Sequence, residues 1–174
     1  MDYTAHYDSP LGGITLASDG LALVGLWFDG QKYFADTLSV QHDEKDLDVF
    51  RRTDNWLDIY FSGKEPNFTP PLRMKGTEFR QEVWQILLTI PFGKTMTYGQ
   101  IAKILADRHK VQSMSAQAVG GAVGHNPISL IIPCHRVIGT NGALTGYAGG
   151  LKKKAWLLDM ESQSSVIFTT NALV

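Results

Sequence analysis

The sequence contains a single cysteine, Cys134, whose neighbours are of types that activate a thiol. Pro133 precedes it, and His135 and Arg136 follow it. Positive charge beside a thiol lowers its pKa from about 8.5 and increases the fraction of reactive thiolate. A lone cysteine is otherwise more often a small buried apolar residue than a nucleophile. The pattern therefore favours covalent chemistry at Cys134, with simple burial as the alternative.

The segment before the cysteine, residues 128–133, is apolar and β-branched, which predicts a short buried strand that leads to it. Adjacent residues of an extended chain point to opposite faces. We therefore do not expect the side chains of Cys134 and His135 to touch, and a bridging water is the simpler link between them.

Two helices are expected just before this segment. Thr97 should cap a helix over residues 98–105, and a polar stretch, residues 107–112, separates it from a helix over residues 113–124. Glycine costs a helix about 1 kcal/mol relative to alanine, so the three glycines of the second helix favour close approach of another surface. The pair has the pattern of a helix-turn-helix with a long connection, and an ordinary packed pair is the alternative.

A helix surfaced with alanine and glycine cannot read the major groove through bidentate side chains. It can press its backbone on a duplex, which suits a shape-led or minor-groove approach. The charge distribution agrees with a polyanionic partner for this half. Residues 1–74 carry 12 acidic and 6 basic residues, whereas residues 75–174 carry 5 acidic and 10 basic ones. Attraction between the two halves explains the asymmetry equally well.

The remaining elements follow from periodicity and turn residues. Strands are expected over residues 3–7, 14–18 and 21–28, with Asp19-Gly20 as a hairpin turn, and then a helix over residues 46–61. The proline-containing stretch 66–71 is the candidate linker. After it come a helix capped by Thr77, a glycine-rich loop over residues 139–150 and a last helix over residues 151–161.

Composition sets the broad class. An apolar fraction of 44% excludes wholesale disorder, and one cysteine excludes an intrachain disulfide and any zinc site built of several cysteines. The sequence shows no run long and apolar enough to span a bilayer and no secretory signal. We therefore expect a cytoplasmic protein without a membrane partner.

Several of these stretches together are similar to one family. Pro133-Cys134-His135-Arg136-Val137 resembles the active-site signature of the O6-alkylguanine-DNA alkyltransferases, also called methylated-DNA–protein-cysteine methyltransferases. The resemblance includes residues 97–102, 118–122, Asn126-Pro127 and 146–151, in the family's order and spacing.

The resemblance implies an α+β fold in two domains. A ribonuclease H-like strand and helix domain would span residues 1–74. A mainly helical, winged-helix-like DNA-binding alkyltransferase domain with a helix-turn-helix would span residues 75–161. Residues 162–174 would form a C-terminal tail, and Val166, Ile167 and Phe168 suggest that it packs on the N-terminal domain.

The implied activity is DNA repair by direct reversal. The protein would bind double-stranded DNA from the minor groove and flip O6-methylguanine out of the stack. It would then transfer the alkyl group irreversibly to Cys134, in a single turnover without a cofactor. Whether O4-methylthymine is a second substrate is left open.

The resemblance also assigns roles to individual residues. His135 would take the thiol proton through a water, Glu161 would orient that imidazole, and Tyr98 would help to protonate the leaving purine. Asn126 would tie the recognition helix to the active-site segment. Arg136 would support the structure without direct chemistry. The residues implied to contact DNA are Tyr98, Gln100, Gln117 and Ala118, and those implied to line the guanine pocket are Val137, Tyr147, Ala148 and Gly149.

The chain departs from the family pattern at two places. Gln117 stands where well-known members carry an arginine that enters the base stack, which predicts weaker or more salt-tolerant DNA binding. The stretch 105–113 is longer, and its Arg108, His109 and Lys110 either reach phosphates or form a solvated loop. Residues 1–74 have only His6 and His42 as zinc-type ligands, so no metal is expected.

Three other functions compete with this one. A non-catalytic alkyltransferase-like module that binds lesions ranks second, because such proteins lack the reactive cysteine. A Cys–His hydrolase would leave the helix-turn-helix unexplained, and a transcription factor would need a recognition helix richer in side chains. The resemblance further implies a monomer without an obligate protein partner.

Overall fold

Three strands in the first third of the chain form an antiparallel meander that buries apolar side chains on both faces of the sheet. They are β1 (Asp2–Ser9), β2 (Gly12–Ser18) and β3 (Leu23–Phe28). A short fourth strand, β4 (His42–Glu44), which the sequence pattern did not predict, runs parallel to β1 and completes the order β3-β2-β1-β4. The computed structural model describes the backbone of residues 1–173 and the side chains of residues 1–163.

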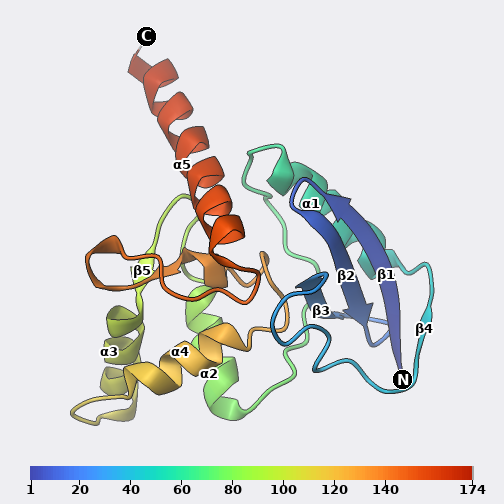
Figure 1. Cartoon of the computed structure of the whole chain (residues 1–174), viewed down its shortest axis with the longest axis horizontal. Helices are drawn as coiled ribbons and strands as arrows, with labels where there is room; N and C mark the ends of the chain where they lie inside the picture. The colour runs from blue at the N-terminus through green and yellow to red at the C-terminus, as the bar shows by residue number, and fades with distance from the viewer. Residues whose placement is uncertain (174) are drawn as a thin grey trace.

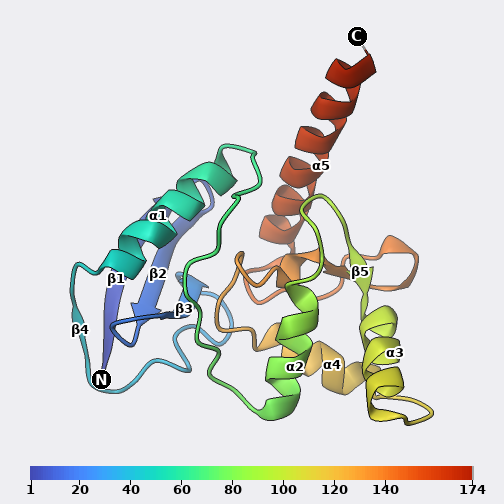
Figure 2. The same cartoon turned by 180° about the vertical axis from the view of Figure 1, so that it is seen from behind.

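The turn between β2 and β3 has the predicted residues. Gly20 has a φ of +108°, and the Asp19 carboxylate accepts hydrogen bonds from the backbone N–H groups of Leu21 and Ala22. Helix α1 (Asp48–Phe61) then packs on one face of the sheet (Figure 2). On the other face, residues 29–41 cover a small cluster formed by Ala17, Val24 and Trp27.

The second half of the chain is mainly helical, and it lies beside the sheet (Figure 1). Its helices are α2 (Glu78–Leu87), α3 (Tyr98–His109), α4 (Ala116–Gly124) and α5 (Leu151–Leu173). Thr77 and Thr97 cap α2 and α3 as predicted, and Ser115 caps α4. Two short strands, β5 (Met96–Thr97) and β6 (Val137–Ile138), pair in parallel and fix the start of α3 beside the cysteine segment.

Two helices are longer than predicted. Helix α3 continues through His109 and ends where Lys110 adopts a left-handed conformation with φ of 54°, so residues 107–109 do not belong to a loop. His109 is held there by the Glu82 carboxylate at 2.8 Å. Helix α5 continues past Glu161 to Leu173, and Figure 1 shows it leading away from the body. The side chains of Val166, Ile167 and Phe168 lie outside the described residues, so their predicted packing is untested.

The strand predicted over residues 128–133 is wrong. These residues form consecutive turns, with one isolated bridge between Leu26 and Ile128 and a left-handed Leu130 (φ 71°). The apolar pattern reported burial correctly, but the side chain of Asn126 bonds the backbone of Ile128 and Ile132 and holds them in a turn. The candidate linker also does more than connect, since Pro71 and Arg73 bond the backbone of Leu23 at the sheet edge.

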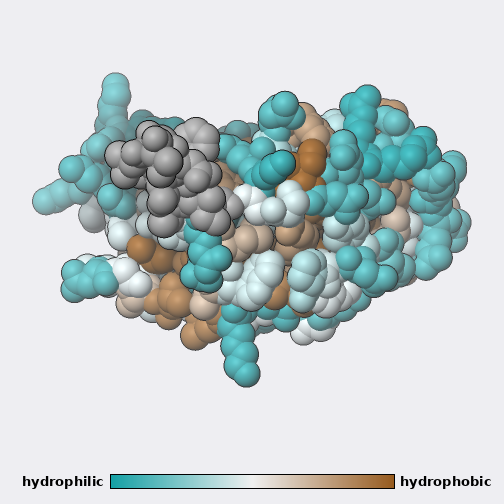
Figure 3. Space-filling view, turned by 90° about the horizontal axis from the view of Figure 1, so that it is seen from above, coloured by the Kyte–Doolittle hydropathy of each residue, from teal (hydrophilic) through white to brown (hydrophobic). Residues whose placement is uncertain are grey.

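The surface seen along α5 is mostly hydrophilic over the N-terminal half, at the right of Figure 3, with hydrophobic side chains gathered at the left. No helix in the described part of the chain is long and apolar enough to cross a membrane.

Candidate active site

Cys134 opens a single turn of 3-10 helix, η1 (Cys134–Arg136), rather than continuing a strand. Its side chain is almost fully buried, and its backbone N–H donates to the carbonyl of Ile132 at 2.8 Å. The predicted extended geometry at this point is therefore wrong, because Pro133 and the preceding turns bend the chain. Within the described residues, the thiol and the His135 ring make no direct hydrogen bond.

The electrostatics of the thiol also differ from the expectation. Burial raises the pKa of Cys134, while the Asn126 side chain and the ammonium group of Lys154 act in the opposite direction. Arg136, which was expected to lower this pKa, points to Glu161 instead. At neutral pH the thiol therefore keeps its proton, and a base is needed to remove it.

Lys154 supplies the positive charge near the thiol that the sequence pattern assigned to His135 and Arg136, the neighbours of Cys134. It lies in the first turn of α5, is fully buried, and its ammonium donates to the carbonyls of Thr145 and Gly146. Burial lowers its own pKa, and the adjacent Cys134 acts in the opposite direction. The sequence run of three lysines thus contains one structural cation that ties α5 to the loop over the thiol.

His135 is bound at one nitrogen only. Its Nε2 lies 2.6 Å from the Glu161 carboxylate, and both residues are buried. A carboxylate can only accept, so Nε2 carries the hydrogen and the lone pair is on Nδ1. Nδ1 is buried and has no hydrogen-bond partner among the described residues. Burial lowers the pKa of His135, so the ring is neutral and able to accept a proton at that nitrogen.

Glu161 is the centre of a buried network. It accepts from the Tyr60 hydroxyl at 2.6 Å, from Arg136 Nε at 2.8 Å and from the backbone N–H of Gly93 at 3.0 Å. Burial alone would raise its pKa, but the hydrogen bond from His135 and the adjacent Arg136 guanidinium lower it to about 2. The carboxylate is therefore ionised at all physiological pH values.

Tyr60 is a residue that sequence reasoning missed. It comes from α1 in the N-terminal half, 101 positions before Glu161, and is fully buried. Only its place in the apolar periodicity of α1 was noticeable in the sequence, and that pattern predicts burial rather than a role for the hydroxyl.

Asn126 joins helix α4 to the active-site segment. Its Nδ2 donates to the carbonyl of Ile132 at 2.7 Å, and its Oδ1 accepts from the N–H of Ile128 at 3.0 Å. These bonds place the backbone that leads into Cys134, and the same side chain lowers the thiol pKa.

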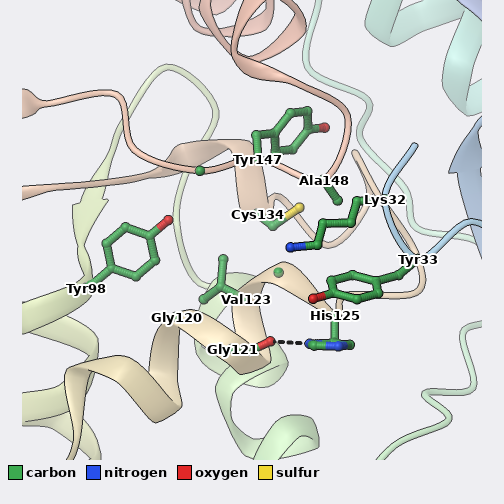
Figure 4. A pocket seen from close by; sticks show the side chains of 12 residues that line it. Lys32, Tyr33, Tyr98, Gly120, Gly121, Val123, His125, Cys134, Tyr147 and Ala148 are labelled. Atoms are coloured by element: carbon green, nitrogen blue, oxygen red, sulfur yellow. Dashed lines mark hydrogen bonds between the residues drawn. The ribbon is translucent and has the colours of Figure 1, made fainter. Parts of the chain in front are cut away.

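The sulfur faces a cavity of about 360 Å³ between the two halves of the chain (Figure 4). Its lining residues are Lys32, Tyr33, Tyr98, Gly120, Gly121, Val123, Gly124, His125, Cys134, Gly146, Tyr147 and Ala148. Tyr98 stands on one side of Cys134 and Lys32 with Tyr33 on the other (Figure 4). The Tyr98 hydroxyl donates to the carbonyl of Thr145 at 3.1 Å.

The predicted pocket residues divide into two groups. Tyr147 and Ala148 line the cavity, whereas Val137 and Gly149 are not among its lining residues. Val137 is buried and pairs with Met96 in the β5–β6 ladder. At Gly149 an added Cβ would lie 2.7 Å from the Tyr147 ring and 3.2 Å from Phe28, so this glycine lets the loop close.

The residues expected to contact DNA lie on α3 and α4. Gln117 and Ala118 are exposed in the first turn of α4. Gln100 is exposed as well, but its side chain accepts from the backbone N–H of Thr97 at 2.8 Å and completes a capping box. No group of three or more histidine, cysteine, aspartate or glutamate side chains suited to a metal ion occurs in the described part of the chain.

Comparison with known proteins gives matches along almost the whole chain. Residues 3–74 match the family described as 6-O-methylguanine DNA methyltransferase, ribonuclease-like domain, and residues 78–163 match its DNA binding domain. A Mycobacterium tuberculosis protein named methylated-DNA–protein-cysteine methyltransferase is 44% identical over 90% of this chain and 92% of its own length. One from Methanosarcina acetivorans is 42% identical over 91% and 97%. Among solved structures, Mycobacterium tuberculosis OGT in complex with DNA has a TM-score of 0.80 at 41% identity, covering 93% of this chain and 94% of that one.

Proposed function

The chain belongs to the 6-O-methylguanine DNA methyltransferase family, and we propose from this premise how its own residues perform the reaction. It repairs DNA by direct reversal, moving the alkyl group of O6-methylguanine to a cysteine of its own. Cys134 is that cysteine, since the chain has no other.

The observation that carries the mechanism is the single-sided binding of His135. Glu161 occupies Nε2 and leaves the buried Nδ1 with a free lone pair. One water between Nδ1 and Sγ would relay the thiol proton to the ring, and the imidazolium that forms is stabilised by the Glu161 carboxylate beside it. This arrangement has the order nucleophile, base and orienting carboxylate, with a water inserted between the first two.

In the transfer step, Sγ attacks the carbon bound to O6. The Sγ–C bond forms as the C–O6 bond breaks, and the electron pair leaves with the purine, which takes up a proton. We assign the donation of that proton to the Tyr98 hydroxyl, which lines the cavity and would have to exchange its present bond to the carbonyl of Thr145 for one to the purine. The resulting thioether has no proton to lose and no ready leaving group, so each molecule reacts once.

DNA binding precedes this step. The chain binds DNA, and we assign the contact to α3 and α4 as a helix-turn-helix that approaches the minor groove. The exposed Gln117 and Ala118 at the start of α4 support this assignment, and Gln117 would fill the place of the flipped base. Tyr98 and Gln100 would contact the strand that carries the lesion.

Finer labels of the fold belong to the same proposal. The mixed sheet with α1 on one face supports a ribonuclease H-like domain over residues 1–74, and α3 and α4 with the short β5–β6 ladder support a winged-helix-like domain over residues 75–161. The tail over residues 162–174, the monomeric state, the absence of a cofactor and the cytoplasmic location stay predictions.

The deciding experiment is intact mass spectrometry of the full chain after incubation with duplex DNA that carries one O6-methylguanine. We expect a gain of one methyl group per chain, located on Cys134 by peptide mapping, and no gain in Cys134→Ser. That variant should still bind the lesion duplex. Lesion binding without a mass gain in the natural chain would instead indicate a damage-sensing module. The absence of both lesion binding and a mass gain would refute the function.

A further inference from the structure

The cavity at Cys134 has a wall from the N-terminal half, which the sequence motifs do not reveal. Lys32 and Tyr33 lie on the loop after β3 and line the cavity together with His125, the residue that follows α4. We name Lys32, Tyr33 and His125 the N-terminal wall. Lys32 and Tyr33 come from the N-terminal half, whereas His125 and the other lining residues come from the C-terminal half.

This wall is held in place by backbone and side-chain contacts. The backbone N–H of Lys32 donates to the carbonyl of Ala148, which also lines the cavity, at 3.0 Å. Tyr33 has a φ of 60°, a backbone conformation that residues other than glycine rarely adopt unless their surroundings hold them there. The loop therefore presents Tyr33 in one defined position.

The three side chains form a stack. The rings of Tyr33 and His125 lie with centroids 3.9 Å apart and an interplanar angle of 24°, and the Lys32 ammonium lies 5.0 Å from the Tyr33 centroid. Figure 4 shows Lys32 and His125 on opposite sides of the Tyr33 ring. His125 is fixed in turn, because its Nδ1 donates to the carbonyl of Gly121 at 2.7 Å. Such a stack resists displacement by a bulky group better than a single exposed side chain.

The location of the wall relative to the sulfur decides its role. Tyr98 begins α3, one of the two helices assigned to DNA, and stands across Cys134 from the wall (Figure 4). A base delivered from the side of α3 meets Sγ with its O6 substituent leading. In an in-line displacement Sγ approaches the carbon opposite O6, so the rest of the substituent leaves the S–C–O axis sideways and must fit in the remaining space of the cavity, which Lys32 and Tyr33 bound.

We propose that the N-terminal wall limits the size of the O6-alkyl group that the protein accepts, with the Tyr33–His125 stack as the specificity-determining contact. The inference rests on the proposed alkyl transfer and adds its substrate range. Transfer of a benzyl group follows the same steps as transfer of a methyl group. The Sγ–CH₂ bond forms, the CH₂–O6 bond breaks, and guanine leaves with the electron pair and takes up a proton. The two groups differ in the room that they require.

The test compares single-turnover rates on two duplexes, one with O6-methylguanine and one with O6-benzylguanine, followed by intact mass. The natural chain should transfer benzyl more slowly than methyl. Tyr33→Ala should raise the ratio of benzyl to methyl rates at least about tenfold, because pocket contacts of this size discriminate by about that factor or more. His125→Ala should move the ratio in the same direction, and Tyr33→Phe, which keeps the ring, should leave it unchanged.

Phe34→Ala is the matched control. Phe34 is the next residue on the same loop, is 41% exposed against 37% for Tyr33, and contacts Trp27 instead of the cavity. Both of its rates should equal those of the natural chain, which separates the wall from a general weakening of the loop.

Three results would overturn the inference. They are an unchanged ratio in Tyr33→Ala, an equal loss of both rates in that variant, or a natural chain that transfers benzyl as fast as methyl. A natural chain that gains no methyl group would refute the transfer itself, and the methyl arm alone identifies that failure.

Discussion

The buried carboxylate of Glu161 offers a stringent test of how the site is built, through the substitution Glu161→Gln. The named partners of this carboxylate, on Tyr60, Gly93, His135 and Arg136, are all hydrogen-bond donors. An amide has the same shape, but its NH₂ group must face at least one of these donors. The change also leaves the Arg136 guanidinium without its counter-ion in the interior.

The expected loss of stability follows from the pKa. Glu161 is shifted from an ordinary 4.5 to about 2, and each pKa unit corresponds to about 1.4 kcal/mol, which gives about 3 kcal/mol at pH 7. Removal of one partner from a buried ion pair costs about 3–5 kcal/mol in other proteins, which agrees. We therefore expect the free energy of unfolding to fall by about 3–5 kcal/mol.

The pH dependence of this difference has a defined sign. Because the folded-state pKa is lowered, the contribution of Glu161 is complete above its ordinary pKa of 4.5 and is lost as the pH falls toward 2. At about pH 3 less than about half of it should remain. Urea unfolding of the natural chain and of Glu161→Gln, at pH 7 and near pH 3, measures whether their free energies of unfolding converge as the pH falls.

The same substitution should slow alkyl transfer. The Glu161 carboxylate raises the pKa of His135 against the effect of burial, so its loss makes the ring a weaker base. General-base contributions are about 100-fold or larger, and we expect a loss of that order in the single-turnover rate of molecules that remain folded.

A second His–Glu pair provides the control. Glu82 and His109 lie 2.8 Å apart, close to the 2.6 Å of Glu161 and His135, but their side chains are 25% and 48% exposed. Glu82→Gln should change the free energy of unfolding by less than about 1 kcal/mol and leave the transfer rate unchanged. If Glu161→Gln behaves like Glu82→Gln in both assays, the argument from the buried network is wrong.

Three further predictions concern other parts of the site. Gln117→Arg should tighten binding to duplex DNA and steepen the salt dependence by about one counterion, measured by fluorescence anisotropy, and no gain in affinity would count against the minor-groove assignment. Lys154→Met should raise the pKa of Cys134 and move the pH–rate profile of transfer to higher pH, whereas Lys152→Met, exposed on the same helix, should not. Asn126→Ala should lower the free energy of unfolding in urea by about 1–3 kcal/mol for each of the two buried backbone groups it bonds, and a loss below about 1 kcal/mol would exclude the proposed tie.

Much of the fold was predictable because it follows from local rules. The strand meander, the Asp19-Gly20 turn and the caps at Thr77 and Thr97 depend on residues close together in the chain. The segment 128–133 was not predictable, since an apolar run indicates burial and leaves the conformation open. Its turns depend on side-chain bonds from Asn126, which compete with a strand ladder.

The candidate site divides in the same way. Cys134 and His135 are marked by composition and motif, and the geometry brings Glu161 to the imidazole as the resemblance implied. The contributions of Tyr60 and of the N-terminal wall arise from contacts across the two halves of the chain. No periodicity or spacing within one half reports such contacts, so they become visible only in three dimensions.

The two halves also share a single apolar interior. One continuous hydrophobic cluster contains residues of the sheet, of α1 and of the helices α2 to α5. The edge strand β3 bonds the backbone of Pro127 and Ser129 through both groups of Leu26. Proteolysis in the stretch 66–71 should therefore give a nicked complex that stays together, rather than a separate DNA-binding fragment, and the reactive thiol would survive such a cut only while both pieces remain associated.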